Sequence, residues 1–285
     1  MRILVIVMHS EEGEFEHCLK ALREQTLKVD IEVISGLGNV EAHSALYRMI
    51  MERTNQYDYF IKCDADMVMK SLTSISEMIS MFKEFPDKNH LCFGLHDFFS
   101  DSRIIGIHAF RNDVRWDLST HGTLLLDPNP INAKTKYIKD DFPAPVAYHV
   151  LHPTDFQSFY FGLHRTLKVL RKDETKLNLK TSFEHFMLLR LVYQHYLRSF
   201  DRRVGLALLG MLKAMDGGLS DLRMKKDNYQ SYFQSVQNFS PEEIKNKITS
   251  NLSDSFLFWC LMYVQLTGPM RIFRSLMQIF VRKVT

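Results

Sequence analysis

The sequence predicts an α/β protein with a doubly wound sheet, followed by a helical C-terminal extension. Three observations support this prediction. Short apolar runs rich in β-branched residues alternate with amphipathic helical patterns over residues 1–65, as in a βαβαβ unit. From residue 154 onward the apolar spacing is wholly helical. The first apolar run, Ile3–Val7, is continuous, which is typical of a strand buried on both faces. We expect a sheet domain over residues 1–175 and a helical extension over residues 176–285.

The individual elements follow from local periodicity and from turn residues. Residues 111–148 lack clear periodicity and are expected to be irregular, while residues 223–239 are polar and resemble a linker. Ser240-Pro241-Glu242-Glu243 has the pattern of a helix N-terminus with a capping box. We expect strands over residues 3–7, 31–34, 57–63, 90–95 and 104–110, the last two as a hairpin, and helices over residues 14–25, 40–53, 72–85, 183–200 and 204–215.

Composition narrows the class of protein. Apolar residues make up 46% and charged residues 24%, which is ordinary globular usage. The chain has 36 Lys and Arg residues and 33 Asp and Glu residues, so its formal net charge is 36 − 33 = +3. This balance is too even to favour a nucleic-acid partner. The four cysteines are scattered without a CxxC pair, so we expect neither a zinc knuckle nor a disulfide framework, and a reduced, cytoplasmic protein fits best. No window reaches the roughly 18 apolar residues of a membrane span.

Three segments are expected at the carboxyl ends of strands, where open α/β sheets bind ligands. They are His9-Ser10-Glu11, Ser35-Gly36 with the following Leu37-Gly38, and Asp64-Ala65-Asp66. Two carboxylates two residues apart on an extended segment point the same way. Together they can hold one hard cation, Mn²⁺ or Mg²⁺, and leave positions open for diphosphate oxygens. The alternative is a solvated turn. Neither a dinucleotide fingerprint nor a P-loop is present.

These segments resemble the nucleotide-binding half of family 2-like GT-A glycosyltransferases of bacterial type. The likeness covers residues 2–70 and includes Cys18-Leu19, Leu22 and Gln25 of the first helix and the DxD triplet at Asp64–Asp66. A second stretch also resembles a bacterial subset, through His149, Pro153, Phe156-Gln157, Phe159, Phe161-Gly162, His164-Arg165 and Lys168.

The resemblance implies a GT-A fold and metal-dependent transfer of a hexose from a nucleotide-diphosphate sugar of the UDP, GDP or dTDP type. The acceptor would be a glycan or a lipid-linked acceptor in surface polysaccharide or glycoconjugate biosynthesis, with inversion at the anomeric carbon. In this family the DxD binds the donor diphosphate through the metal, so that Asp64 would contact the ribose or the metal and Asp66 the metal. Several members complete the metal site with a late His. His149, at the end of an expected strand over residues 145–148, and His152 are the two candidates.

Two further roles are assigned to candidates. A basic group at His164-Arg165 on the next helix would stabilise the leaving diphosphate. The alternative is that these residues lie on a solvent-exposed helix face without a ligand. An inverting transferase also needs a carboxylate base, for which we select Asp97, in a polar and aromatic segment after a strand. A turn cap is the alternative role for Asp97. The other acidic candidates for the base are Asp101, Asp113, Asp117, Asp140 and Asp141.

Two other functions remain open from the sequence. A nucleotidyltransferase would make the sugar nucleotide, but it usually carries a Gly-rich basic loop after the first strand, where this chain is acidic. A non-catalytic scaffold could retain the fold. Residues 255–284 are apolar with cationic residues beside one helical face, which suits either an anionic membrane surface or packing on the core or on a second subunit. A peripheral position on the inner face of the cell membrane is one expectation.

Overall fold

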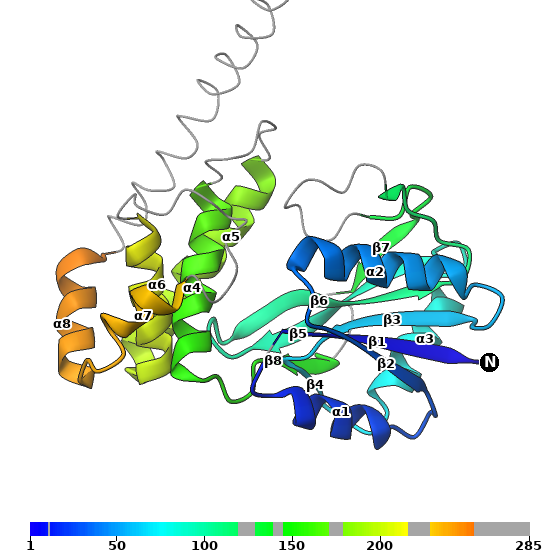
Figure 1. Cartoon of the computed structure of the whole chain (residues 1–285), viewed down its shortest axis with the longest axis horizontal. Coiled ribbons are helices and arrows are strands. Elements are labelled where there is room, and N and C mark those ends of the chain that lie inside the picture. Colours follow the sequence, from blue (N-terminus) through cyan, green and yellow to red (C-terminus); the bar gives the residue numbers. More distant parts are fainter. Residues whose placement is uncertain (11, 119–128, 139–144, 171–178, 216–228, 254–285) are drawn as a thin grey trace, which may run out of the picture. The chain divides into compact units, whose positions relative to one another are not determined.

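The computed structural model describes residues 1–10, 12–118, 129–138, 145–170, 179–215 and 229–253 (Figure 1). The chain divides into two compact units, Met1–Pro153 and Thr154–Thr285. The division lies at the start of a long helix, whereas the sequence placed the end of the sheet domain near residue 175. Each unit is described by itself below.

The first unit is built on a mixed sheet of eight described strands in the order β2-β1-β3-β6-β5-β8-β4, with β7 also paired to β5. Both β2 and β3 run parallel to the central β1, as expected of a βαβαβ unit. β6 is antiparallel to both β3 and β5. The strands are β1 (Ile3–His9), β2 (Asp30–Ser35), β3 (Tyr59–Asp64), β4 (Met67–Met69), β5 (His90–Asp97), β6 (Ser102–Arg111), β7 (Thr135–Ile138) and β8 (Ala147–His149).

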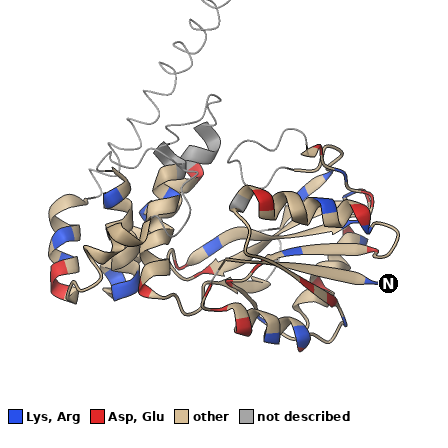
Figure 2. Ribbon diagram, in the orientation of Figure 1, with Lys and Arg blue, Asp and Glu red and all other residues tan. Residues whose placement is uncertain are grey.

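Helices cover both faces of this sheet. The helices α1 (Phe15–Arg23) and α3 (Ser74–Glu84) bury apolar side chains with one face, in a core that includes Val5, Ile61 and Phe93. The helix α2 (Asn39–Glu52) covers the other face, packing Leu46 and Tyr47 with Phe60 and Phe110. The ribbon of α1 carries both acidic and basic positions (Figure 2). Glu16 in the first turn and Lys20 and Arg23 in the last turn are exposed, which suits the helix dipole.

The expected alternation of strands and helices over residues 1–110 is confirmed, including the β5–β6 hairpin. Residues 111–148 are less irregular than expected, because they contain β7, while β8 confirms the strand expected over residues 145–148 with slightly different bounds. Both strands are short. β7 pairs with β5, and β8 pairs with β5 and β4, which are all distant in sequence. β4 was also not predicted, since three residues directly after a turn carry no pattern of their own.

The described part of the second unit is helical, as the sequence predicted. The segment expected to be a linker contains α7, where Phe233 is buried. The expected capping box is present at Ser240, which accepts a hydrogen bond from the Glu243 backbone N–H. The helices are α4 (Asp155–Leu170), α5 (Leu179–Ser199), α6 (Arg202–Met215), α7 (Gln230–Gln234) and α8 (Pro241–Asn251).

Among the described helices, none combines the length and apolar character that a bilayer crossing requires. The amphipathic C-terminal helix predicted over residues 255–284 lies outside the described residues.

Candidate metal and nucleotide site

The carboxyl ends of the parallel strands bring the predicted donor-site segments to one edge of the sheet. Ser35 at the end of β2 is the register partner of His9 on β1, and Met8 is the partner of Asp64 on β3. Gly36 has φ +70°, a left-handed conformation that suits glycine and turns the chain away after β2. Ser10 donates its backbone N–H to the Glu12 carboxylate. Glu11 lies outside the described residues.

The Asp64-Ala65-Asp66 triplet makes the turn between β3 and β4. Ala65 is fully buried and donates its backbone N–H to the Met8 carbonyl at 2.9 Å, which holds the turn against β1. One carboxylate oxygen of Asp64 and one of Asp66, the Oδ1 atoms, are buried without a hydrogen-bond partner, and they are the only such side-chain atoms in the described residues. Lys62 Nζ lies 3.4 Å from Asp64 Oδ1 as an ion pair. Because buried polar atoms are nearly always hydrogen-bonded, two oxygens without a hydrogen bond in one turn point to a further ligand, although the charge of Lys62 lies beside the one on Asp64.

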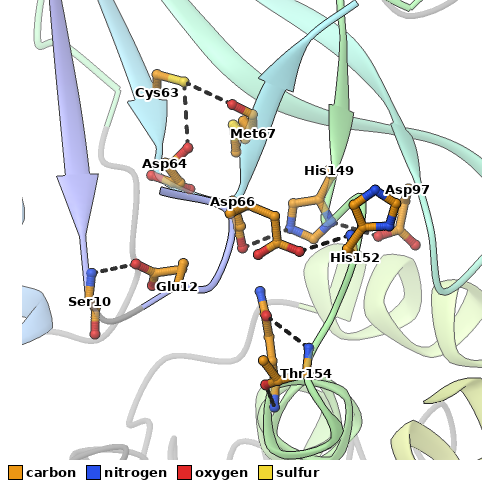
Figure 3. A network of polar contacts seen from close by, with 12 residues as sticks. Ser10, Glu12, Cys63, Asp64, Asp66, Met67, Asp97, His149, His152 and Thr154 are labelled. Atoms are coloured by element: carbon orange, nitrogen blue, oxygen red, sulfur yellow. Dashed lines mark hydrogen bonds and ion pairs between the residues drawn. The ribbon is translucent and has the colours of Figure 1, made fainter. Parts of the chain in front are cut away.

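His149 on β8 lies between two carboxylates (Figure 3). Its Nδ1 is 2.6 Å from Asp97 Oδ1, and its Nε2 is 3.6 Å from Asp66 Oδ2. The sheet creates this row because His149 pairs with Met67 of β4 on one side and with Asp97 of β5 on the other. Residues from three strands distant in sequence therefore meet at one edge.

Asp97 is completely buried and its carboxylate is fully engaged. Its Oδ2 accepts hydrogen bonds from the Ser100 backbone N–H at 2.7 Å and from the Ser100 hydroxyl at 2.6 Å. Burial by itself raises the pKa of Asp97, but the hydrogen bonds from His149 and Ser100 outweigh it and hold the pKa below its ordinary value. The carboxylate is thus ionised at neutral pH, but no part of it reaches solvent.

The pKa of Asp66 is shifted upward, in the opposite direction to that of Asp97. Burial raises the pKa of Asp66 to about 6; His149 counteracts this, while Asp64, Glu12 and Glu14 raise it further. Several carboxylates at one partly enclosed edge repel each other. A divalent cation would relieve that repulsion, so the electrostatics favour a metal ion in this position.

The chain beyond His149 is held in an unusual backbone conformation. Val150 has φ +55°, which is uncommon for a β-branched residue, and its N–H donates to the Asp66 carbonyl at 2.8 Å. This bond ties the end of β8 to the DxD turn. His152 is exposed; its backbone N–H donates to Glu14 Oε1 at 3.0 Å, and its ring centroid lies 6.4 Å from that of His17.

The structure therefore brings Asp64, Asp66, Asp97 and His149 together and places His9 beside Ser35. His164 and Arg165 belong to α4 of the second unit, where their side chains contact Tyr160 and Phe161.

Three site residues were not singled out from the sequence: Glu12, Glu14 and Ser100. Glu12 and Glu14 follow β1 directly, so their position after a buried strand was an available signal. The hydrogen bonds from Ser100 to Asp97 agree with the turn cap that the sequence left as the alternative role for Asp97, although the sequence did not name Ser100 as its partner.

Comparison with known proteins identifies no family for the chain. No protein-family model matches it, and no curated protein matches it. Among solved structures, a cytidylyltransferase from Leptospira borgpetersenii matches 68% of this chain and 94% of its own, with 11% identity and a TM-score of 0.32. The crystal structure of A197 from STIV matches 49% of this chain and 82% of its own, with 12% identity and a TM-score of 0.30. Likenesses this distant do not identify an activity.

Proposed function

We propose that the chain is a divalent-metal-dependent glycosyltransferase that takes its sugar from a nucleotide-diphosphate sugar. The observation that supports this most is the pair of buried carboxylate oxygens on Asp64 and Asp66 that accept no hydrogen bond, at the carboxyl edge of parallel strands; Asp64 Oδ1 has Lys62 beside it as an ion pair. Carboxylate oxygens with an imidazole nearby are a donor set that Mn²⁺ accepts, and Mg²⁺ accepts the carboxylates. Asp64, Asp66 and His149 would hold the ion, which would neutralise charge on the departing diphosphate.

The contacts of His149 favour it over His152 as the third ligand. A proton on Nδ1 donated to Asp97 leaves the Nε2 lone pair on the side of Asp66, the arrangement in which a second carboxylate orients a metal-binding imidazole. We propose this positioning role for Asp97 in place of the general-base role, because a carboxylate without solvent exposure and with both oxygens hydrogen-bonded is poorly placed to take a proton from an acceptor hydroxyl.

The remaining donor contacts are proposed from position. His9, Ser10, Ser35 and Gly36 border the site at the ends of β1 and β2, where a nucleoside would be held. His164 and Arg165 stay candidates for the diphosphate, by the resemblance of their segment alone. The sugar, the acceptor and inversion of configuration are likewise expectations from that resemblance.

The test is a thermal-shift panel of UDP, GDP, CDP and dTDP, each with Mn²⁺ and with EDTA, on the full chain. A ligand that binds only the folded state at about 100-fold excess over its Kd stabilises by ~2.7 kcal/mol, which gives a clear rise in Tm. We expect a Mn²⁺-dependent rise with one diphosphate. Asp66→Asn should abolish it, and Asp87→Asn, at an exposed turn distant in sequence, should not.

The panel and a product assay also distinguish the glycosyltransferase from a non-catalytic scaffold and from a nucleotidyltransferase. Absence of any metal-dependent shift would favour a non-catalytic scaffold. With substrate supplied, release of a nucleoside diphosphate indicates sugar transfer, whereas release of pyrophosphate indicates a nucleotidyltransferase.

A further inference from the structure

A second cluster of metal-binding side chains lies in the same sheet, away from the DxD turn. His90 and Cys92 are two residues apart on β5 and therefore point to the same face. His108 on β6 is the register partner of Cys92, so it joins them on that face. Their ligand atoms all lie within 4.8 Å of one another, and this is the one group of His, Cys, Asp and Glu with such geometry in the described chain.

The spacing of the three ligand atoms is close to that of a tetrahedral zinc site. His90 Nε2 is 2.9 Å from His108 Nδ1, and Cys92 Sγ lies 3.2 Å from the former and 3.5 Å from the latter. Zinc bonds of about 2.0–2.1 Å to nitrogen and about 2.3 Å to sulfur at tetrahedral angles require separations of roughly 3.4–3.6 Å. Shifts of about half an ångström or less would admit the ion.

The surroundings fix the two ligands on β5. His90 and Cys92 are buried, and the His90 ring stacks on Phe110 with centroids 4.6 Å apart. Thr135 Oγ1 on β7 lies 3.0 Å from His90 Nδ1. An Nδ1–H donated to this hydroxyl leaves the Nε2 lone pair directed at the cluster, which is how an outer hydrogen bond orients a metal-ligating His.

The charge balance also admits a cation. Lys62, the register partner of His108, places its ammonium 3.4 Å from the Asp64 carboxylate, so its charge is paired there. A Cys92 thiolate would offset half the charge of a divalent ion. Binding would exchange the thiol proton for a sulfur–metal bond, with the proton released to solvent.

This cluster is separate from the proposed donor site. His90 begins β5 and Asp97 ends it, which at ~3.3 Å per residue is about 23 Å along the strand. A bulge between Phe93 and Gly94 lies between the two positions. The donor set differs as well: one sulfur and two imidazoles favour zinc, whereas carboxylates favour magnesium and manganese.

We propose that His90, Cys92 and His108 form a zinc site with three protein ligands and a fourth position for water or another small ligand. Three protein ligands leave a coordination position open, unlike the closed four-ligand sites of zinc fingers. The proposal does not depend on the glycosyltransferase assignment, since it rests on other residues.

The test uses the metal-free full chain titrated with Co²⁺, a spectroscopic substitute for Zn²⁺. We expect one equivalent to produce a thiolate-to-cobalt charge-transfer band and tetrahedral ligand-field bands, and Zn²⁺ to displace the cobalt and abolish them. Cys92→Ser and His108→Ala should remove the charge-transfer band. Cys18→Ala, at another buried cysteine, and Asp66→Asn, in the donor site, should retain it. Thr135→Val should weaken Zn²⁺ binding about 10–100-fold.

A measurement on the wild-type chain tests the proposal even if the variants fail to fold. X-ray absorption of the zinc-loaded protein should show one sulfur and two imidazole nitrogens around the metal. A spectrum without sulfur, or no charge-transfer band with Co²⁺, would leave the three side chains a metal-free hydrogen-bonded group and overturn the proposal.

Discussion

At the scale of the residue, Asp66 links stability to pH and to metal. Its folded pKa of about 6 lies above the ordinary carboxyl value of 3.8, so the folded state binds the proton more tightly than the unfolded state. Stability of the metal-free protein should therefore fall as pH rises through this window. We expect Asp66→Asn to stabilise the protein in EDTA by up to about 3 kcal/mol at pH 7.5, and far less at pH 4.

Urea unfolding at both pH values measures this difference, with Glu16→Gln on the exposed side of α1 as the control. Saturating Mn²⁺ should stabilise the wild type and leave Asp66→Asn unchanged. A variant that is less stable than the wild type in EDTA at pH 7.5 would contradict the electrostatic account of this turn.

The second prediction at this scale concerns Asp97. If it orients His149, Asp97→Asn should weaken Mn²⁺ binding about 10–100-fold, because the amide can present the wrong partner to Nδ1. Ser100→Ala removes a hydroxyl that binds Asp97 but keeps the carboxylate on His149, so affinity should change much less. Titration of free Mn²⁺ by electron paramagnetic resonance checks both. Equal losses in the two variants, in step with their stabilities, would indicate a structural role only.

At the scale of the element, two glycines determine how α4 packs on α6. A Cβ added at Gly162 would lie 1.7 Å from the Ala207 carbonyl oxygen, and one at Gly210 would lie 2.0 Å from the Phe159 carbonyl oxygen. Backbone atoms cannot move aside as flexible side chains do. We expect Gly162→Ala to destabilise the second unit by about 1–3 kcal/mol or more.

The control for this prediction is Gly205→Ala on α6, where the three atoms nearest to the added methyl belong to the side chains of Ile244, Tyr196 and Ile248. Its cost should be smaller, since those side chains can shift. Far-UV circular dichroism during urea unfolding reports the helical unit. A Gly162→Ala protein as stable as the wild type would mean that the two helices can separate without loss.

Element prediction from sequence succeeded where a segment carries its own pattern. Ile3–Val7 and the amphipathic α1 are recognisable alone, because their periods reflect burial on one face or two. β4 and β7 were not predicted, since three or four residues hold no periodicity and become strands only through partners distant in the chain, whereas β8 was expected over residues 145–148.

At the scale of the whole molecule, the C-terminal segment over residues 254–285 lies outside the described residues, and its role is an expectation from the sequence. Its apolar face with flanking Arg271, Arg274 and Arg282 suits an anionic membrane surface or a protein partner. If the membrane role holds, deletion of residues 270–285 should reduce sedimentation with vesicles containing phosphatidylserine but not with neutral vesicles. Equal sedimentation of the full and truncated chains would favour packing on protein.

The sequence by itself determined the alternation of strands and helices, the helical character of the described part of the second unit, and the DxD triplet at the end of a buried strand. These features follow from local periodicity and from one turn. Only the tertiary structure decided that His149 sits between Asp66 and Asp97, that Asp97 is buried, and that His90, Cys92 and His108 converge. The physical reason is that antiparallel and crossover pairing in the sheet brings strands distant in sequence into register, and no spacing along the chain encodes that register.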